Sequence, residues 1–170
     1  MPLSYLDIIA GKTRQILALV QSAGAADGNK LIATDSSGRL DSSVMPVGFG
    51  SETKVIPASE ALAAGDFVNI YSNAGALNVR KADASNPAKE AHGFVLSAVA
   101  SAAQATVYYG NLNTAQTGLT IGVNHYLSGT TPGRATATAP TTSGYIVQQL
   151  GVANSATEML VELQPTVQLA

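Results

Sequence analysis

Residues 91–170 carry only three charged side chains, Arg134, Glu158 and Glu162, and this limits how the segment can fold and persist in water. The other ionisable Lys, Arg, Asp and Glu residues all lie in the first 90 positions. Because charge keeps soluble monomers apart, we expect a charge-poor segment to be covered by copies of itself or by partners. A stable domain with a Ser, Thr and Asn surface is the alternative.

From about Ser51 onward, runs rich in Val, Ile, Thr and Tyr alternate with Gly, Asn, Ser and Pro, which predicts short strands and turns. The expected strands are 54–57, 67–71, 77–81, 91–98, 104–110, 125–127, 135–139, 145–153 and 159–164, with turns at 73–76, 110–113 and 128–133. One helical turn within 58–66 is also compatible with the sequence. This spacing, without long helical stretches, predicts a mainly β domain over 51–170, a small β-barrel or sandwich.

Residues 1–50 differ from the rest because they hold many turn residues and little core-forming material. Two runs, SYLDII and RQILALV, favour extended chain hinged at Ala10-Gly11, although Ser4 and Asp7 could also cap a helix. A strand at 30–34, a turn at 35–38 and a Gly-rich linker at 47–53 complete the prediction. We therefore expect an extended N-terminal arm that gains order from a neighbouring subunit.

Two stretches, 65–98 and 122–156, resemble each other. Val68-Asn69 with Tyr71 matches Val123-Asn124 with Tyr126, and each match is followed by a Gly-containing turn, a strand with Arg and Ala, and a Gly that opens an apolar strand. The pattern predicts a strand–turn–strand–loop–strand unit made twice. Two ordinary hairpins with common turn residues would give a similar pattern.

The sequence offers little catalytic chemistry. Cysteine is absent, which removes disulfides, thiolate metal sites and cysteine nucleophiles, and the net charge of −2 does not suit a phosphate-binding surface. No apolar run reaches the ~18 residues of a membrane span, and the opening residues lack signal-peptide features. GKT at 11–13 lacks the context of a phosphate-binding loop, DSSGRLD at 35–41 lacks the acidic spacing of a calcium loop, and no GxSxG occurs.

His92 and His125 are the only histidines, and neither has metal-ligand spacing. Glu90 and His92 would face the same side of a strand, where an ion pair is the simplest interpretation. We expect no catalytic residue, no cofactor, no metal, and neither nucleic acid nor membrane as a partner. A small enzyme or ligand-binding barrel would instead require convergent carboxylates in a pocket near one of these histidines.

Residues 22–50 resemble a sequence stretch near the N-termini of structural proteins of tailed bacteriophages; the run here is SAGAADGNKLIATDSSGRLDSSVMPVGFG. AAGDFVNIYSNAG and YLSGTTPGR further along are similar to stretches of their small β-modules. The resemblance implies a non-enzymatic virion protein, a capsid decoration or cement protein made in the bacterial cytoplasm and bound to the capsid surface. The alternative within the same resemblance is a head-fibre, collar or tail-associated attachment protein.

Such decoration proteins are typically trimers whose N-terminal arm contacts the shell, so the resemblance implies the major capsid protein and further copies of this chain as partners. The implied capsid-contacting residues are Lys30, Leu31, Ile32, Arg39, Leu40, Val44, Met45 and Pro46. Large aromatic side chains suit buried strand positions and interfaces. The tyrosines expected at the oligomer interface are Tyr108, Tyr109, Tyr126 and Tyr145.

Overall fold

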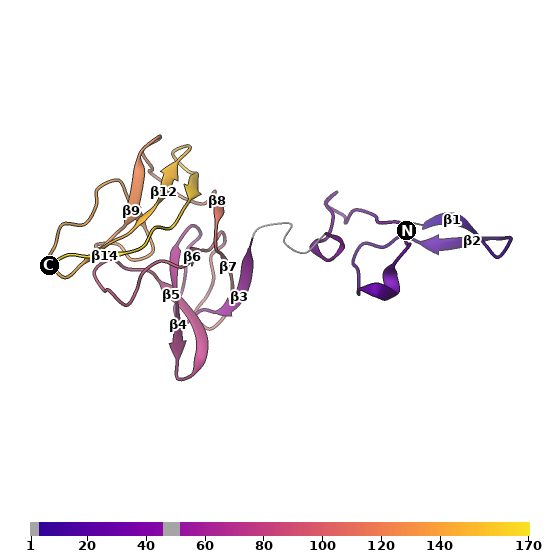
Figure 1. Cartoon of the computed structure of the whole chain (residues 1–170), viewed down its shortest axis with the longest axis horizontal. Coiled ribbons are helices and arrows are strands. Elements are labelled where there is room, and N and C mark those ends of the chain that lie inside the picture. The colour runs from indigo at the N-terminus through magenta and orange to yellow at the C-terminus, as the bar shows by residue number, and fades with distance from the viewer. Residues whose placement is uncertain (1–3, 46–51) are drawn as a thin grey trace. The chain divides into compact units, whose positions relative to one another are not determined.

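The computed structural model describes residues 4–45 and 52–170 of the chain, and the chain divides into two units, 1–50 and 51–170 (Figure 1). We call these the N-terminal unit and the C-terminal unit and describe each by itself. The chain is mainly β: no α-helix occurs in the two described ranges, and the only helical segments there are 3₁₀ turns.

The N-terminal unit begins with an antiparallel hairpin of β1 (Ser4–Ile9) and β2 (Lys12–Leu17). Ala10 and Gly11 at its turn have φ values of 52° and 74°, the left-handed pair that a two-residue hairpin turn requires. The extended interpretation with a hinge at Ala10-Gly11 is therefore confirmed. Two 3₁₀ turns follow, η1 (Ala25–Asp27) and η2 (Ser42–Val44).

The strand predicted at 30–34 is wrong. Only an isolated parallel bridge forms, in which Leu19 N–H donates to Leu31 O and Ala33 N–H donates to Leu19 O, each at 2.8 Å. The turn predicted at 35–38 is present, closed by a 3.0 Å bond from Gly38 N–H to Asp35 O. Most of the predicted linker, 47–53, lies outside the described residues.

The C-terminal unit contains two five-stranded antiparallel sheets. The first consists of β3 (Thr53–Pro57), β4 (Phe67–Asn73), β5 (Ala76–Lys81), β6 (Gly93–Phe94) and β7 (Gln104–Tyr108). The second consists of β8 (Asn111–Asn113), β9 (Asn124–Leu127), β10 (Ala135–Thr136), β12 (Gln149–Ala153) and β13 (Met159–Val161). A small pair, β11 (Ile146–Val147) with β14 (Val167–Gln168), completes the unit.

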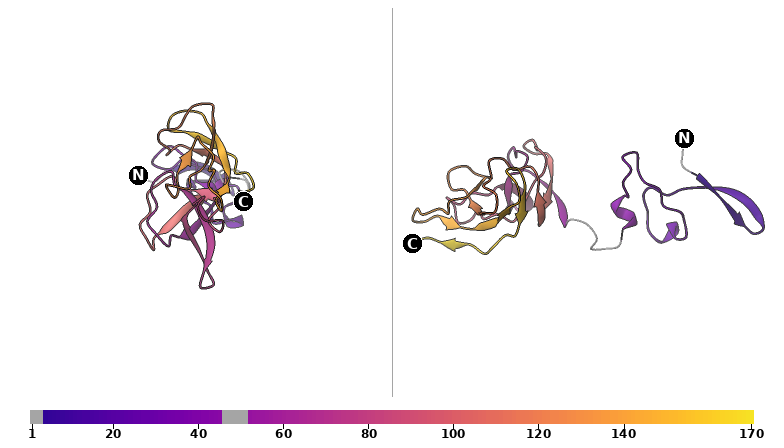
Figure 2. Two further views of the ribbon diagram at one scale, coloured as in Figure 1. Left: turned by 90° about the vertical axis from the view of Figure 1, so that its left-hand side faces the viewer. Right: turned by 90° about the horizontal axis from the view of Figure 1, so that it is seen from above.

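The two five-stranded sheets have the same topology. Their orders are β3-β7-β6-β4-β5 and β8-β13-β12-β9-β10, so in each the first strand pairs with the last and the second and third form a hairpin at one edge. The β4–β5 hairpin projects from the rest of its unit in both Figure 1 and the left view of Figure 2. Neither sheet closes into a barrel. The three-strand repeat predicted from the sequence is thus part of a longer, five-strand one.

The residues that match between the two sequence repeats do not occupy equivalent positions in the strand pairing of the two sheets. Gly93 lies opposite Val68, whereas Gly151 lies opposite His125 rather than Val123, the residue that matches Val68 in the sequence. The offset is an even number of residues, so each glycine still faces the same side of its sheet. The pairing of β12 with β9 also shifts between Gln149 and Gly151.

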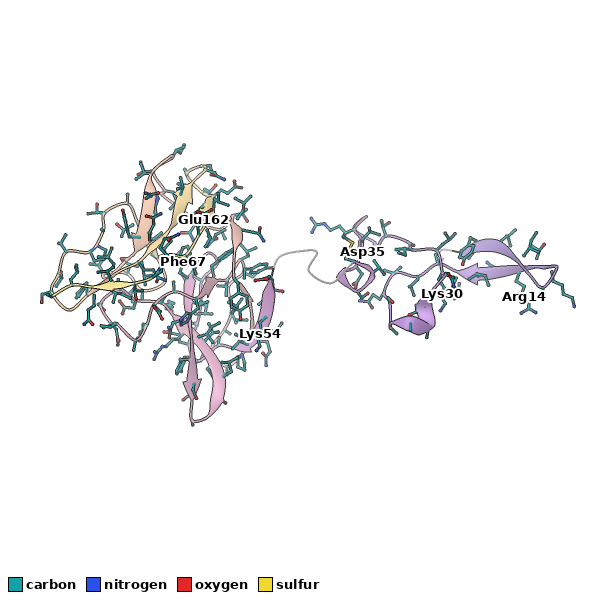
Figure 3. The ribbon with its side chains drawn as sticks, viewed as in Figure 1. Arg14, Lys30, Asp35, Lys54, Phe67 and Glu162 are labelled. Atoms are coloured by element: carbon teal, nitrogen blue, oxygen red, sulfur yellow. The ribbon has the colours of Figure 1, made fainter. Side chains whose placement is uncertain are left out.

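Successive residues of the first sheet enter two different cores. Phe67, Phe94 and Tyr108 pack on one face, where they meet Leu127, Leu150 and Met159 of the second sheet. Their neighbours Val68, Val95 and Val107 pack on the other face with Ile56 and Leu62. Figure 3 shows Phe67 in the interior of the unit. Because both faces are covered at these points, apolar residues stand at consecutive positions, as in Phe67-Val68 and Phe94-Val95.

Several local predictions fail. Residues 58–66 form no helical turn, because Ala58 and Leu62 are engaged in strand bridges with Val79 and Val99. GNLN at 110–113 is not a turn, since three of its residues form β8. The strand predicted at 91–98 is reduced to β6, and β14 was not predicted at all.

Gly151 gives a prediction on stability. A Cβ built there would lie 2.0 Å from Leu160 O, in the neighbouring strand β13, and the φ of Gly151 is +151°. We expect Gly151→Ala to destabilise the C-terminal unit by about 1–3 kcal/mol, because backbone must shift to admit the methyl group. Urea unfolding followed by far-UV circular dichroism checks this. Gly75→Ala, in the exposed β4–β5 turn where a Cβ meets nothing within 4 Å, is the comparison for backbone strain alone.

Candidate attachment surface and polar clusters

The β1–β2 hairpin presents large apolar side chains to solvent. Leu6 and Ile8 are 73% and 72% exposed, and Leu17 is 60% exposed. The register places Leu6 opposite Gln15 and Leu17 opposite Ser4, so Leu6, Ile8 and Leu17 share one face of the hairpin. An isolated two-stranded hairpin is marginally stable in water. This face is therefore suited to burial against another surface.

The loops that follow the hairpin are held together by a few specific bonds. Ser22 N–H donates to Ser43 Oγ at 2.8 Å, and Gln21 Nε2 donates to Asp41 Oδ2 at 3.0 Å. Together with the bridge at Leu19, these bonds bring the segments 19–22, 31–33 and 41–43 side by side. Arg14, Lys30 and Asp35 are labelled along this unit in Figure 3.

The structure brings four of the eight predicted capsid-contacting residues together. Lys30, Ile32, Val44 and Met45 line one hollow of ≈ 400 Å³ within the N-terminal unit. Leu31 and Leu40 are 57% and 52% exposed beside these loops. The remaining two are Arg39, which is exposed, and Pro46, which lies outside the described residues.

Three aspartates fix these loops. Asp35 Oδ1 accepts bonds from the N–H groups of Arg39 and Ser37 and from Ser37 Oγ, at 2.9, 2.8 and 2.7 Å, and these bonds lower the pKa of Asp35. The Lys30 side chain, followed by the Ala23 N–H, lowers the pKa of Asp27. Hydrogen bonds from Ser43 and then from Gln21 lower the pKa of Asp41.

These shifts predict that acid loosens the N-terminal loops. All three pKa values lie below the ordinary 3.8, so the stabilisation is fully present above that value and is lost as the pH falls through the lowered pKa values. An NMR titration from about pH 5 to pH 2 should move the amide signals of Ala23, Ser37 and Arg39 together. The amide of Leu127, which donates to Gln148 O at 2.9 Å and has no acidic residue as a chain neighbour, is the control. Ser37 and Arg39 signals unchanged by acid would contradict the prediction.

The predicted pairing of Glu90 with His92 is present, at 3.3 Å between Oε1 and Nε2. The Ile70 N–H donates to His92 Nδ1 at 3.0 Å, just beyond the point where β6 stops pairing with β4. The ring therefore substitutes for a strand partner at the end of the ladder, with Nδ1 as acceptor and Nε2–H directed at Glu90. This arrangement is a structural cap.

His125, in contrast, is 2% exposed. Its Nε2 accepts from Thr120 N–H at 3.3 Å, and its Nδ1 lies 3.0 Å from Val123 O. Both ring nitrogens are engaged with backbone close in sequence, so His125 closes the turn before β9. Among the described residues no group of three or more His, Asp or Glu side chains is placed to hold a metal ion.

The four tyrosines predicted at an interface occupy different environments. The Tyr108 ring stacks on Phe94 with 5.6 Å between centroids, and Tyr109 packs against the other core. Tyr126 is half-buried in β9, and the ring of Tyr145 lies over Gly129. Tyr108 and Tyr109 therefore serve core packing, and an interface role for the four remains a prediction.

Asp66 does more than cap the turn that precedes β4. Its side chain is 2% exposed, and Ala63 N–H donates to Oδ2 at 2.8 Å as a cap should. In addition, Arg134 Nε lies 3.3 Å from Oδ1 and Lys81 Nζ lies 3.8 Å from Oδ2. Asp66 precedes β4 of the first sheet and Arg134 precedes β10 of the second, so this cluster links the two sheets.

Comparison with known proteins found no matching family model, no matching curated protein and no matching solved structure. No helix within the described ranges is long and apolar enough to cross a membrane.

Proposed function

We propose that this chain is a non-enzymatic structural protein of a bacteriophage virion, a capsid decoration protein whose N-terminal unit attaches it to the major capsid protein. The observation that carries the proposal is the row of exposed apolar side chains on the N-terminal unit, on the hairpin and on the loops around Leu31 and Ile32. Burying such a surface is favourable by about 25 cal/mol per Å² of apolar area. The sequence resemblance at 22–50 supports a phage capsid as the surface that covers it.

The C-terminal unit would form the part of the protein that projects from the shell. For its architecture we propose a sandwich, supported by the core around Phe67 and Met159, which receives side chains from both five-stranded sheets. We further propose that three copies associate, since few charges on 91–170 oppose their contact. A repetitive lattice would then bind each trimer through three weak sites at once, which raises the overall affinity.

The test is binding of the purified full chain to heads of the parent phage prepared without it. We expect saturable binding at a fixed number of copies per head, and a loss of binding of about tenfold or more in the double variant Leu31→Ser/Ile32→Ser. Val167→Ser is the matched control, since Val167 is 63% exposed but lies in the C-terminal unit. Failure of the full chain to bind, or equal binding by the double variant and the control, would contradict the proposal.

Light scattering tests the trimer separately. A mass of three chains is expected for the protein free in solution, whereas a monomeric mass would remove the trimer from the proposal while leaving attachment to be judged by the head-binding experiment.

A further inference from the structure

Two adjoining clefts flank the loop 128–134 between β9 and β10, far along the sequence from the N-terminal unit. The first, of ≈ 230 Å³, is lined only by Ser, Gly, Thr, Ala, Pro and Tyr, with Tyr145 as its single aromatic ring. The second, of ≈ 450 Å³, is lined by Gln116 and Arg134 together with Ser, Thr and Ala residues. The two share Ser128 and Thr130 of this loop and Thr136 of β10, so they adjoin one another.

The first cleft contains side-chain hydroxyls that the protein leaves unused. Within the described residues, the hydroxyls of Thr138, Thr141, Thr142 and Tyr145 form no hydrogen bond with the protein. The Tyr145 ring packs closely on Gly129, since a Cβ at that glycine would lie 2.5 Å from Tyr145 Cε2. A fixed aromatic face beside free hydroxyls offers both apolar contact and hydrogen bonds.

The second cleft is lined by a buried glutamine, Gln116, whose side-chain oxygen can accept a hydrogen bond. Gln116 is only 3% exposed, and its Nε2 donates to Gly65 O, which fixes the amide. Its Oε1 receives no bond from the protein, yet no buried side-chain nitrogen or oxygen of the described residues lacks a partner. This oxygen is therefore not fully covered by the protein, and Gln116 is one of the residues that line the second cleft. A buried side-chain amide whose nitrogen is held by a hydrogen bond and whose oxygen has none is a pre-organised acceptor for a ligand.

Arg134 adds hydrogen-bond donors beside the second cleft, and Asp66 offsets part of its charge. Its Nε faces Asp66 Oδ1 at 3.3 Å and its Nη1 reaches Ala64 O at 3.4 Å, and Arg134 is one of the residues that line the second cleft. Asp66 faces both Arg134 and Lys81, so one carboxylate offsets only part of two positive charges. The first cleft, which holds Tyr145, has no charged lining residue and therefore favours a neutral ligand over an anion.

We propose that these clefts bind a neutral saccharide, with the C–H face of one pyranose ring on Tyr145 and the hydroxyls of the adjoining sugar on Gln116 Oε1 and Arg134. Sugars present an apolar face and a rim of hydroxyls that are each donor and acceptor, which matches an aromatic ring surrounded by hydroxyl, amide and guanidinium groups. The site lies wholly in the C-terminal unit, so it is independent of the proposed attachment through the N-terminal unit.

Saturation-transfer NMR of the full chain with maltotriose, cellotriose, chitotriose and mannotriose tests the proposal. We expect at least one trisaccharide to receive saturation, and its affinity to fall about tenfold or more in Tyr145→Ala and severalfold in Thr138→Val. Tyr145→Phe keeps the ring and should retain most of the binding. Thr114→Val is the matched control, because Thr114 is exposed and lies outside both clefts.

Circular dichroism on each variant establishes that the fold is retained, and Thr138→Val covers the case in which Tyr145→Ala unfolds. Three results would each overturn the proposal: no saturation of any of the four trisaccharides, unchanged affinity in both Tyr145→Ala and Thr138→Val, or binding of an oligogalacturonate in place of the neutral sugars. None of these results bears on head binding, so the two proposals fail separately.

Discussion

Phe94→Ala is expected to lower the free energy of unfolding of the C-terminal unit by about 3–5 kcal/mol. Phe94 is fully buried, its ring centroid lies 6.2 Å from that of Phe67 and 5.6 Å from that of Tyr108, and the core around it takes residues from both five-stranded sheets. Truncation would leave a cavity at the centre of this shared core. The whole unit should therefore lose stability, and not the first sheet alone.

Chemical denaturation followed by both tyrosine fluorescence and circular dichroism measures this loss, since the chain has no tryptophan. The two signals should shift together in Phe94→Ala. Val55→Ala, at a strand position that is 59% exposed, should change stability by about 0.5 kcal/mol or less. Two separate transitions, with only one of them shifted, would mean that the sheets fold independently and that the shared core contributes little.

Asp66→Ala is the second substitution with a large expected effect, about 3 kcal/mol of destabilisation. Removing one partner of a buried ion pair typically costs 3–5 kcal/mol, because the remaining charge is left uncompensated. We expect the lower end of that range, since the side chains of Arg134 and Lys81 are 33% and 32% exposed and can turn partly towards water. The substitution also removes the acceptor for the Ala63 N–H.

A set of variants separates these contributions. Asp66→Asn keeps an oxygen for the Ala63 N–H and should be less damaging than Asp66→Ala. Arg134→Met, combined with Asp66→Asn in a double-mutant cycle, should show that the two losses are not additive, because both remove the same interaction. Additive losses would mean that the charge pair does not contribute to holding the sheets together.

The strands of the C-terminal unit could be predicted because local signals and packing agree there. The run Phe67-Val68 is apolar at consecutive positions since its residues serve two cores. The turn at 73–76 contains the Asn and Gly that tight turns favour, and its central residues, Ala74 and Gly75, have φ values of 49° and 86°. Where a strand depends on distant pairing, local signals fail. Asn111–Asn113 has turn-forming residues, but its pairing with Met159–Val161 makes it a strand.

The candidate sites were less predictable for the same reason. Asp66, Gln116 and Arg134 are far apart in the sequence, and only the packing of the two sheets brings a carboxylate, an amide and a guanidinium near one another. The loops of the N-terminal unit, in contrast, depend on contacts within a few residues, such as Asp35 with Ser37 and Arg39. That turn is accordingly visible in the sequence as DSSGR.

The pairing of β3 with β7, and of β8 with β13, has a consequence for how the chain acquires its structure. About fifty residues separate each pair of partners, so neither sheet is complete until its final strand has left the ribosome and returned to the start. The chain loses the entropy of closing these long loops before the hydrogen bonds between the paired strands form, and this slows folding. Proteins dominated by such non-local contacts fold in milliseconds to seconds. During synthesis the unpaired edge of β3 remains open for the time needed to make the intervening segment.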